Sequence, residues 1–214
     1  MAIKGAVKAK CPFGCEPFET EMWSLVRGDR DANLKETLLA GELNLLCCPN
    51  CGKHFYHEEL VIYFDPGMEI LGFIFPHSYE SEEKKWRAKM DEDYKMLKER
   101  LWKEKQFSFE PEIFFGLEGL KKMLEEEVDR EDETEIIECL AGELGLKTRR
   151  VKSSYSRARG VPRVIPFSAD VFTKDSAMEG SRKVLDRNKR LASLGKFLKG
   201  LEAGRDGGLP PILE

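Results

Sequence analysis

The chain has 214 residues, of which 41% are hydrophobic and 35% are charged, with a formal net charge of −4 and a pI near 5.7. These values are ordinary for a globular protein of one large or two small domains, and the acidic balance disfavours binding of a polyanion over the whole surface. No apolar run reaches the roughly 20 residues of a membrane helix, and the N-terminus lacks the apolar stretch of a signal peptide, so we expect a cytoplasmic protein without a membrane segment.

Two short segments each place a pair of cysteines close together. The first is CPFGC at residues 11–15, and the second is CPNC at residues 48–51. Disulfides are rare in the cytoplasm, so such pairs indicate metal or redox chemistry. A redox motif of the thioredoxin kind belongs to a βαβ pattern, whereas the residues around the second pair predict a strand, a cysteine turn and a second strand. The pattern therefore favours metal.

The spacing within each pair matches structural zinc sites, in which two to four residues separate paired ligands. We predict one structural Zn²⁺ with four thiolate ligands that complete a tetrahedron. The ligands are Cys11, Cys15, Cys48 and Cys51. Cys47 is expected to point away from the metal and to be a small buried apolar residue, because successive strand residues face opposite sides. Cys47, His54 or His57 could replace one of the four, but four thiols make a replacement unnecessary.

The residues between and after the two turns predict a small β domain with an inserted helix. Polar and apolar residues alternate over residues 18–26, which is typical of a strand with one buried face. The segment DANLKETLLAGEL has leucines at helical spacing after Asp31, a candidate N-cap. Farther on, the apolar runs LVIYF and EILGFIF flank the turn signal Asp65-Pro66-Gly67 and predict a hairpin.

The order of these features resembles the CpXC domain, a family named for its paired cysteine turns. The similarity covers about residues 8–76 and includes CPFGCEPFETEMWSLV, ANLKETLLAGELNLLCCPNCGKHF and VIYFDPGMEILGFIFP. Family members typically have Cys-Pro-x-Cys in the first turn, whereas this chain has one residue more. The resemblance implies a zinc-binding domain but no particular activity, because the molecular role of the family is largely unassigned. Some longer members carry an acidic helical stretch, which residues 112–146 resemble.

After Pro76 the composition becomes highly charged and helical. One apolar stripe along SEEKKWRAKMDEDYKMLKERLWKEK predicts a helix that packs on the sheet, with docking on another chain as the alternative. The stripe consists of Trp86, Met90, Tyr94, Leu97 and Leu101. Residues 109–146 then hold thirteen acidic and three basic residues. Apolar positions predict two amphipathic helices here, at 117–128 and at 136–144, joined at EEEVDREDE, with Cys139 in the core. A solvated acidic face is favoured over a Mg²⁺ site.

The sign of the charge reverses at residue 147. Residues 147–163 contain no acid and seven basic side chains, namely Lys147, Arg149, Arg150, Lys152, Arg157, Arg159 and Arg163. Serine, glycine and proline argue against regular structure, so we expect a flexible basic arm. Such an arm can bind phosphate backbones through counterion release, or it can dock on an acidic protein surface, of which this chain has its own. One amphipathic basic helix is expected over residues 181–201, and the apolar tail LPPILE is expected to lie against another surface.

The expected fold is therefore α+β, with a zinc-ribbon-like β domain followed by a mostly helical C-terminal half. The expected regions are a CpXC-like zinc-binding domain at 1–77, a charged helical region at 78–146, and the arm, helix and tail at 147–214. The chain lacks the phosphate-loop, dinucleotide, zincin and nucleophile-elbow motifs, and four thiolates leave a metal no open position, so a non-enzyme is favoured. We expect a protein–protein interaction module. The alternative is nucleic-acid binding through residues 147–163 and the basic C-terminal helix.

Overall fold

The structure is a computed structural model that describes residues 2–100, 109–204 and 209–210. The chain forms two compact units, Met1–Leu124 and Glu125–Glu214, and the boundary between them falls inside the long helix α3 (Leu117–Glu143). The expected α+β class is confirmed, with a β-sheet in the N-terminal part and helices in the C-terminal half. None of the helices in the described ranges combines the length and the apolar character needed to cross a membrane.

The first unit is built on a five-stranded mixed sheet in the order β1-β2-β5-β6-β7. Its strands are β1 (Ile3–Ala9), β2 (Phe18–Arg27), β5 (Val61–Asp65), β6 (Ile70–Phe75) and β7 (Glu112–Phe115). The predicted strand at 18–26 and the predicted hairpin are confirmed as β2 and β5–β6. Two strands were not predicted, because β1 is a largely exposed, lysine-bearing edge strand and β7 has only four residues.

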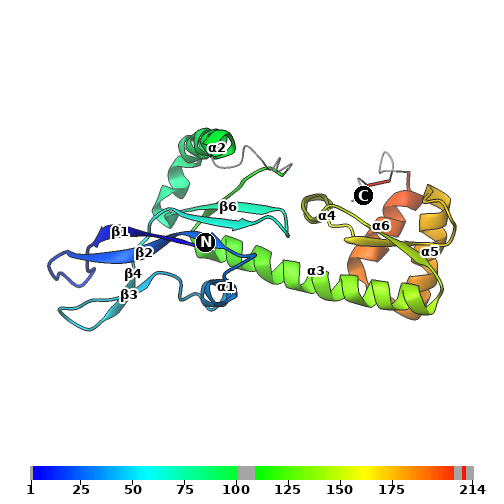
Figure 1. Ribbon diagram of the computed structural model, residues 1–214, viewed down its shortest axis with the longest axis horizontal. Coiled ribbons are helices and arrows are strands. Elements are labelled where there is room, and N and C mark those ends of the chain that lie inside the picture. The colour runs from blue at the N-terminus through cyan, green and yellow to red at the C-terminus, as the bar shows by residue number, and fades with distance from the viewer. Residues whose placement is uncertain (1, 101–108, 205–208, 211–214) are drawn as a thin grey trace. The chain divides into compact units, whose positions relative to one another are not determined.

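Alternate side chains of the central strands face two separate cores. On one face, Val61 and Tyr63 pack with α1 (Ala32–Leu39) and with the first turns of α3. On the other face, Phe64 and Phe73 pack with α2 (Glu83–Arg100), which follows a short 3-10 helix, η1 (His77–Glu82). Figure 1 shows α2 on one side of the sheet, with α1 and the start of α3 on the other.

The apolar stripe predicted after residue 76 packs within the first unit. Trp86, Met90, Tyr94 and Leu97 all belong to the core between α2 and the sheet, so packing on the sheet is confirmed for these four residues, whereas Leu101 lies outside the described residues. The helix predicted after Asp31 is confirmed as α1. The Asp31 carboxylate, however, accepts no capping hydrogen bond from the described residues.

The second unit combines the rest of α3 with a two-stranded sheet and three further helices. These elements are β8 (Lys147–Arg150), α4 (Ser153–Arg159), β9 (Val164–Phe167), α5 (Lys174–Arg187) and α6 (Ala192–Glu202). Its core brings β9 together with α5 and α6 and includes Ile137 of α3. Leu209 packs against the same core, as expected for the start of the apolar tail.

Three predictions that concern the helices of this half of the chain are wrong. Residues 117–143 form one helix rather than two, because no glycine or proline interrupts the segment from residue 120 to residue 141. Cys139, placed in the core by the two-helix reading, is exposed in the continuous helix. The helix expected at 181–201 is two helices, which are separated by residues 188–191.

The segment expected to be a flexible basic arm has regular structure. β8 pairs antiparallel with β9, and α4 ends at Gly160, whose positive φ of 60° suits a residue without a side chain. The buried Ser156 hydroxyl donates a hydrogen bond to the Val161 carbonyl and fixes the return to β9. These stabilising contacts come from residues distant in sequence or from a single polar side chain, so composition alone did not indicate them.

Replacing Gly180 in α5 by alanine is expected to destabilise the second unit by about 1–3 kcal/mol. A Cβ atom at this position would lie 2.5 Å from the Pro166 carbonyl oxygen and 2.6 Å from Phe167 Cα, both of which are backbone atoms of β9. Gly195→Ala in α6 is the matched control, because its Cβ would meet no described atom within 4 Å. The control should gain about 0.5–1 kcal/mol from helix propensity. Chemical denaturation of both variants measures the difference, and equal stabilities would contradict the close packing of α5 on β9.

Candidate metal centre

Two turns from different parts of the first unit carry the four predicted cysteines. Cys11 and Cys15 lie between β1 and β2. Cys48 and Cys51 lie between β3 (Leu45–Cys47) and β4 (His54–Tyr56), which form a separate two-stranded sheet. Figure 1 shows the β1–β2 and β3–β4 connections side by side at one end of the unit. The second turn is the predicted strand, cysteine turn and strand.

Glycine allows each turn to fold back sharply. The backbone N–H of Gly14 donates to the Cys11 carbonyl at 3.2 Å, and that of Gly52 donates to the Cys48 carbonyl at 2.8 Å. Both glycines have positive φ, 85° and 68°, which a side chain would disfavour. The extra residue in the first turn, compared with Cys-Pro-x-Cys, is thus accommodated in a closed turn.

The four sulfur atoms have the spacing of a tetrahedral metal site. They all lie within 4.8 Å of one another, and the Cys11 and Cys51 sulfurs are 3.9 Å apart. A tetrahedron with metal–sulfur bonds of about 2.3 Å has sulfur–sulfur edges of about 3.8 Å. Cys11 and Cys48 are buried, whereas Cys15 is half-buried and Cys51 is exposed. The described residues therefore place four thiols where they can bind one metal ion.

The thiols influence one another's ionisation. Burial disfavours the thiolate of Cys48, but the backbone N–H groups of Cys51 and Asn50 outweigh it and lower the pKa of this thiol to about 7. For Cys15, the neighbouring thiols, Cys51 first, and burial raise the pKa to about 12. Negative charges this close repel one another, so a bound cation would be required for all four sulfurs to be thiolates at neutral pH.

The other candidate ligands lie outside this group. Cys47 is exposed, so the prediction that it is buried is wrong, and its sulfur is 3.6 Å from the Gly52 carbonyl oxygen. His57 instead lies 3.4 Å from the Glu59 carboxylate, and His54 is an exposed residue of β4. Among the described residues, the only group of metal-ligating side chains within bonding range of one ion is the four-cysteine group.

A small apolar cluster supports the cysteine turns. It contains Met22, Leu46 and Phe55 together with the buried cysteines, and the rings of Phe18 and Phe55 pack edge to face with centroids 6.2 Å apart. A cluster of this size buries little apolar surface, so cross-links between the two turns would add to the stability of the β3–β4 sheet. A metal ion bound to both turns would supply them.

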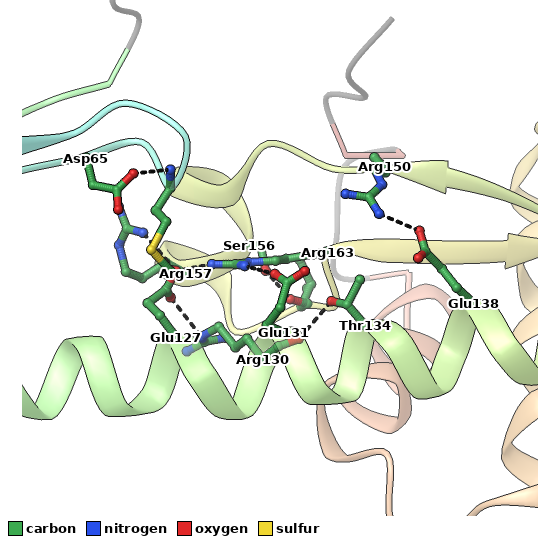
Figure 2. A network of polar contacts seen from close by, with 12 residues as sticks. Asp65, Glu127, Arg130, Glu131, Thr134, Glu138, Arg150, Ser156, Arg157 and Arg163 are labelled. Atoms are coloured by element: carbon green, nitrogen blue, oxygen red, sulfur yellow. Dashed lines mark hydrogen bonds and ion pairs between the residues drawn. The ribbon is translucent and has the colours of Figure 1, made fainter. Parts of the chain in front are cut away.

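The basic residues expected to contact a partner make ion pairs within the second unit. Figure 2 shows Arg157 and Arg163 directed at Glu127 of α3, whose carboxylate is fully buried. Arg163 also pairs with Glu131, and Arg130 Nε lies 3.2 Å from Glu127. The structure therefore assigns two of the predicted binding residues to the inside of the unit.

The remaining five basic residues lie nearer to the surface. Arg150 pairs with Glu138 at 2.8 Å, as Figure 2 shows, and Lys147 pairs with Asp170 at 2.8 Å. Arg149 and Arg159 are exposed, and Lys152 is half-buried. The exposed positive charge of residues 147–163 is thus smaller than the composition of the segment indicates.

Sequence reasoning missed Glu127 as a key residue of the second unit. The buried positions of α3 include Leu120, Leu124 and Ile137, and Glu127 falls on the same helical face. A carboxylate on the apolar face of a helix indicates a buried partner of opposite charge. This signal was present in the sequence but was hidden within the acidic run EEEVDREDE.

The comparisons with known proteins agree with the geometry of the cysteine turns. The family model described as CpXC protein matches residues 9–140, which is more than half of the chain. The matched range includes all four cysteines, the whole sheet of the first unit from residue 9 onward, and most of α3. Neither the curated proteins nor the solved structures contain a significant match.

Proposed function

The chain belongs to the CpXC family, and on that premise we propose that it is a non-enzymatic zinc protein that binds a protein partner. The observation that carries the proposal is the group of four cysteine sulfurs within 4.8 Å of one another. Tetrahedral coordination by four sulfurs is typical of zinc or of iron–sulfur sites. Mononuclear zinc suits two knuckle-like turns that each close with a glycine.

A zinc ion with four thiolate ligands has a structural role. Catalytic zinc sites have three protein ligands and keep the fourth position for water or substrate. In this protein Cys11, Cys15, Cys48 and Cys51 would occupy all four positions. The ion would hold the β1–β2 turn against the β3–β4 turn and so give the first unit a fixed surface.

A protein partner is favoured over nucleic acid because the basic residues are largely paired. Arg157 and Arg163 form ion pairs with Glu127, and Arg150 and Lys147 form ion pairs with Glu138 and Asp170. A phosphate backbone would have to compete with these carboxylates for the same guanidinium and ammonium groups. The net charge of −4 adds a weak general repulsion.

Elemental analysis of the purified full-length protein tests the metal. We expect about one zinc ion per chain and little iron, because the four sulfurs define one tetrahedral site. Removal of the ion with a chelator should lower the unfolding temperature of the first unit, since binding free energy of structural zinc is also folding free energy. A metal-free preparation with the same unfolding curve would contradict the proposal.

A pull-down with and without nuclease tests the partner class. A protein-binding module should retain the same partner after nuclease treatment, whereas a nucleic-acid-dependent complex should be lost. Generic RNA and DNA should bind only feebly at physiological salt, because four of the seven basic residues in 147–163 already pair with carboxylates of the protein. Tight, salt-sensitive binding of generic nucleic acid by the intact protein would favour the alternative.

A further inference from the structure

A pocket in the first unit lies next to the metal-bearing hairpin. It has a volume of about 390 Å³, within the range of roughly 300–1,000 Å³ that is common for ligand-binding pockets. One wall is formed by Gly41, Leu43 and Asn44, before β3, and by residues 56–59, at the end of β4 and after it. The opposite wall is formed by residues 74–77 and by the β7–α3 junction, residues 115–118.

Part of the pocket lining is apolar and buried. It includes Leu43, Val61 and Ile74, which are buried and belong to the core on the α1 and α3 face of the sheet. At the mouth, Tyr56 has 54% of its surface exposed, and its hydroxyl donates a hydrogen bond to the Gly41 carbonyl. An exposed tyrosine beside an apolar pocket is typical of the anchor residues of protein interfaces.

Among the described lining residues the carboxylates outnumber the basic side chains, which are His57, 3.4 Å from Glu59, and His77. Glu58, Glu59 and Glu118 lie at its rim, and all three are exposed. The Glu58 carboxylate accepts a hydrogen bond from the backbone N–H of His77 at 3.0 Å, which fixes one acid across the mouth. Among the described lining residues there is no lysine or arginine. The pocket therefore favours a ligand with positive charge.

The start of α3 also lines this pocket and carries the positive end of the helix dipole. That end is equivalent to roughly half an elementary charge. Three carboxylates outweigh it, and Glu118 lies in the first turn of α3, where it offsets the dipole directly. The net preference of the site is therefore for a cation rather than an anion.

The metal site holds one wall of the pocket in place. Tyr56 belongs to β4, and the turn that connects β3 to β4 carries Cys48 and Cys51. At the base of the same wall, the Asn44 side chain accepts from the Trp23 N–H at 2.8 Å and donates to the Trp23 carbonyl at 3.0 Å. The hairpin is thus tied to β2 at one end, and a metal ion would tie it to the first cysteine turn at the other.

We propose that this pocket is the docking site for a protein partner, and that it binds a segment with a large apolar side chain next to a lysine or arginine. The inference rests on the proposed function and adds the location of the site and the chemistry of the partner. The apolar side chain fills the space above Val61 and Ile74. The stem of the basic residue covers the exposed Tyr56 ring, and its charged end meets the rim carboxylates.

Selection from a random peptide library on the zinc-loaded full-length protein tests this proposal. We expect enriched peptides to contain a large apolar residue beside lysine or arginine. Glu59→Lys should lower the affinity of the protein for these peptides by about tenfold or more, because it reverses a charge at the rim. Glu36→Lys is the matched control, since Glu36 is an exposed acid of α1 outside the pocket, and its effect should stay within about twofold.

Two further measurements complete the test. Tyr56→Ala should lower the affinity for the same peptides while the zinc content stays unchanged. Chelation of the zinc should lower the affinity of the wild-type protein for these peptides. Failure to enrich this pattern, or peptides indifferent to Glu59→Lys and Tyr56→Ala, would overturn the assignment of the pocket. If both variants still retain a nuclease-resistant partner, the docking site is not this pocket, and the proposed function stands. If zinc or that partner is absent from the wild type, the proposed function itself fails.

Discussion

Cys48→Ser is expected to abolish stoichiometric zinc binding and to unfold the β3–β4 hairpin. Cys48 is a buried member of the four-cysteine group, and backbone N–H groups lower the pKa of its thiol to about 7, which favours the thiolate form that binds a metal. The binding free energy of structural zinc is about 10–16 kcal/mol at neutral pH, and a large part of it is lost with one ligand. Elemental analysis and thermal unfolding measure the two effects.

Cys47→Ser is the matched control for this variant. Cys47 is adjacent in sequence, but it is exposed and lies outside the four-cysteine group. Its replacement should leave the zinc content unchanged and alter the stability by no more than about 0.5 kcal/mol, as for other surface substitutions. Similar zinc loss in both variants would mean that Cys47 takes part in the site.

Arg163→Met is expected to destabilise the second unit by about 3 kcal/mol. Arg163 is 8% exposed and pairs with the fully buried Glu127 and with Glu131. Its removal leaves the buried Glu127 carboxylate with one positive partner fewer, although Arg157 and Arg130 still face it. The expected cost is therefore near the lower end of the range for a broken buried pair. Denaturant unfolding of the second unit measures it.

Two further variants separate the buried ion pair from a general effect of charge. Arg149→Met removes the same charge from an exposed position and should change the stability by less than about 0.5 kcal/mol. Combining Arg163→Met with Glu127→Leu removes both partners of the ion pair. The stability lost by the double variant should therefore be smaller, by at least about 1 kcal/mol, than the summed losses of the two single variants. Strictly additive effects would show that the two residues are not coupled.

The group of four cysteines was predictable from sequence because its signals are local. Two cysteines with two or three residues between them and a glycine in or after the turn define half of a site wherever the chain places them. The predicted strand at 18–26, helix α1 and hairpin β5–β6 also follow from short-range alternation, helical spacing and turn residues. The sequence further indicated that the stripe of α2 would be buried, since a narrow apolar stripe needs one surface to pack on.

The structure of residues 147–163 was not predictable in the same way, because its stabilising partners are distant in sequence. β8 has four exposed residues and forms only by pairing with β9. Arg157 and Arg163 become ordered through Glu127, at sequence separations of 30 and 36 residues. Composition correctly indicated positive charge, but it could not show that a carboxylate in α3 would neutralise much of it.

The sequence by itself determined the identity and spacing of the four thiols, the local elements around them and the family to which the chain belongs. Only the tertiary structure decided that the two cysteine turns meet and that α3 continues through its acidic segment. It also decided that one pocket is lined by Gly41, Leu43 and Asn44 together with residues 56–59, 74–77 and 115–118. The physical reason is the range of the interactions. Turn and helix propensities act over a few residues, whereas thiol clustering, buried ion pairs and pocket walls depend on segments that the folded backbone brings together.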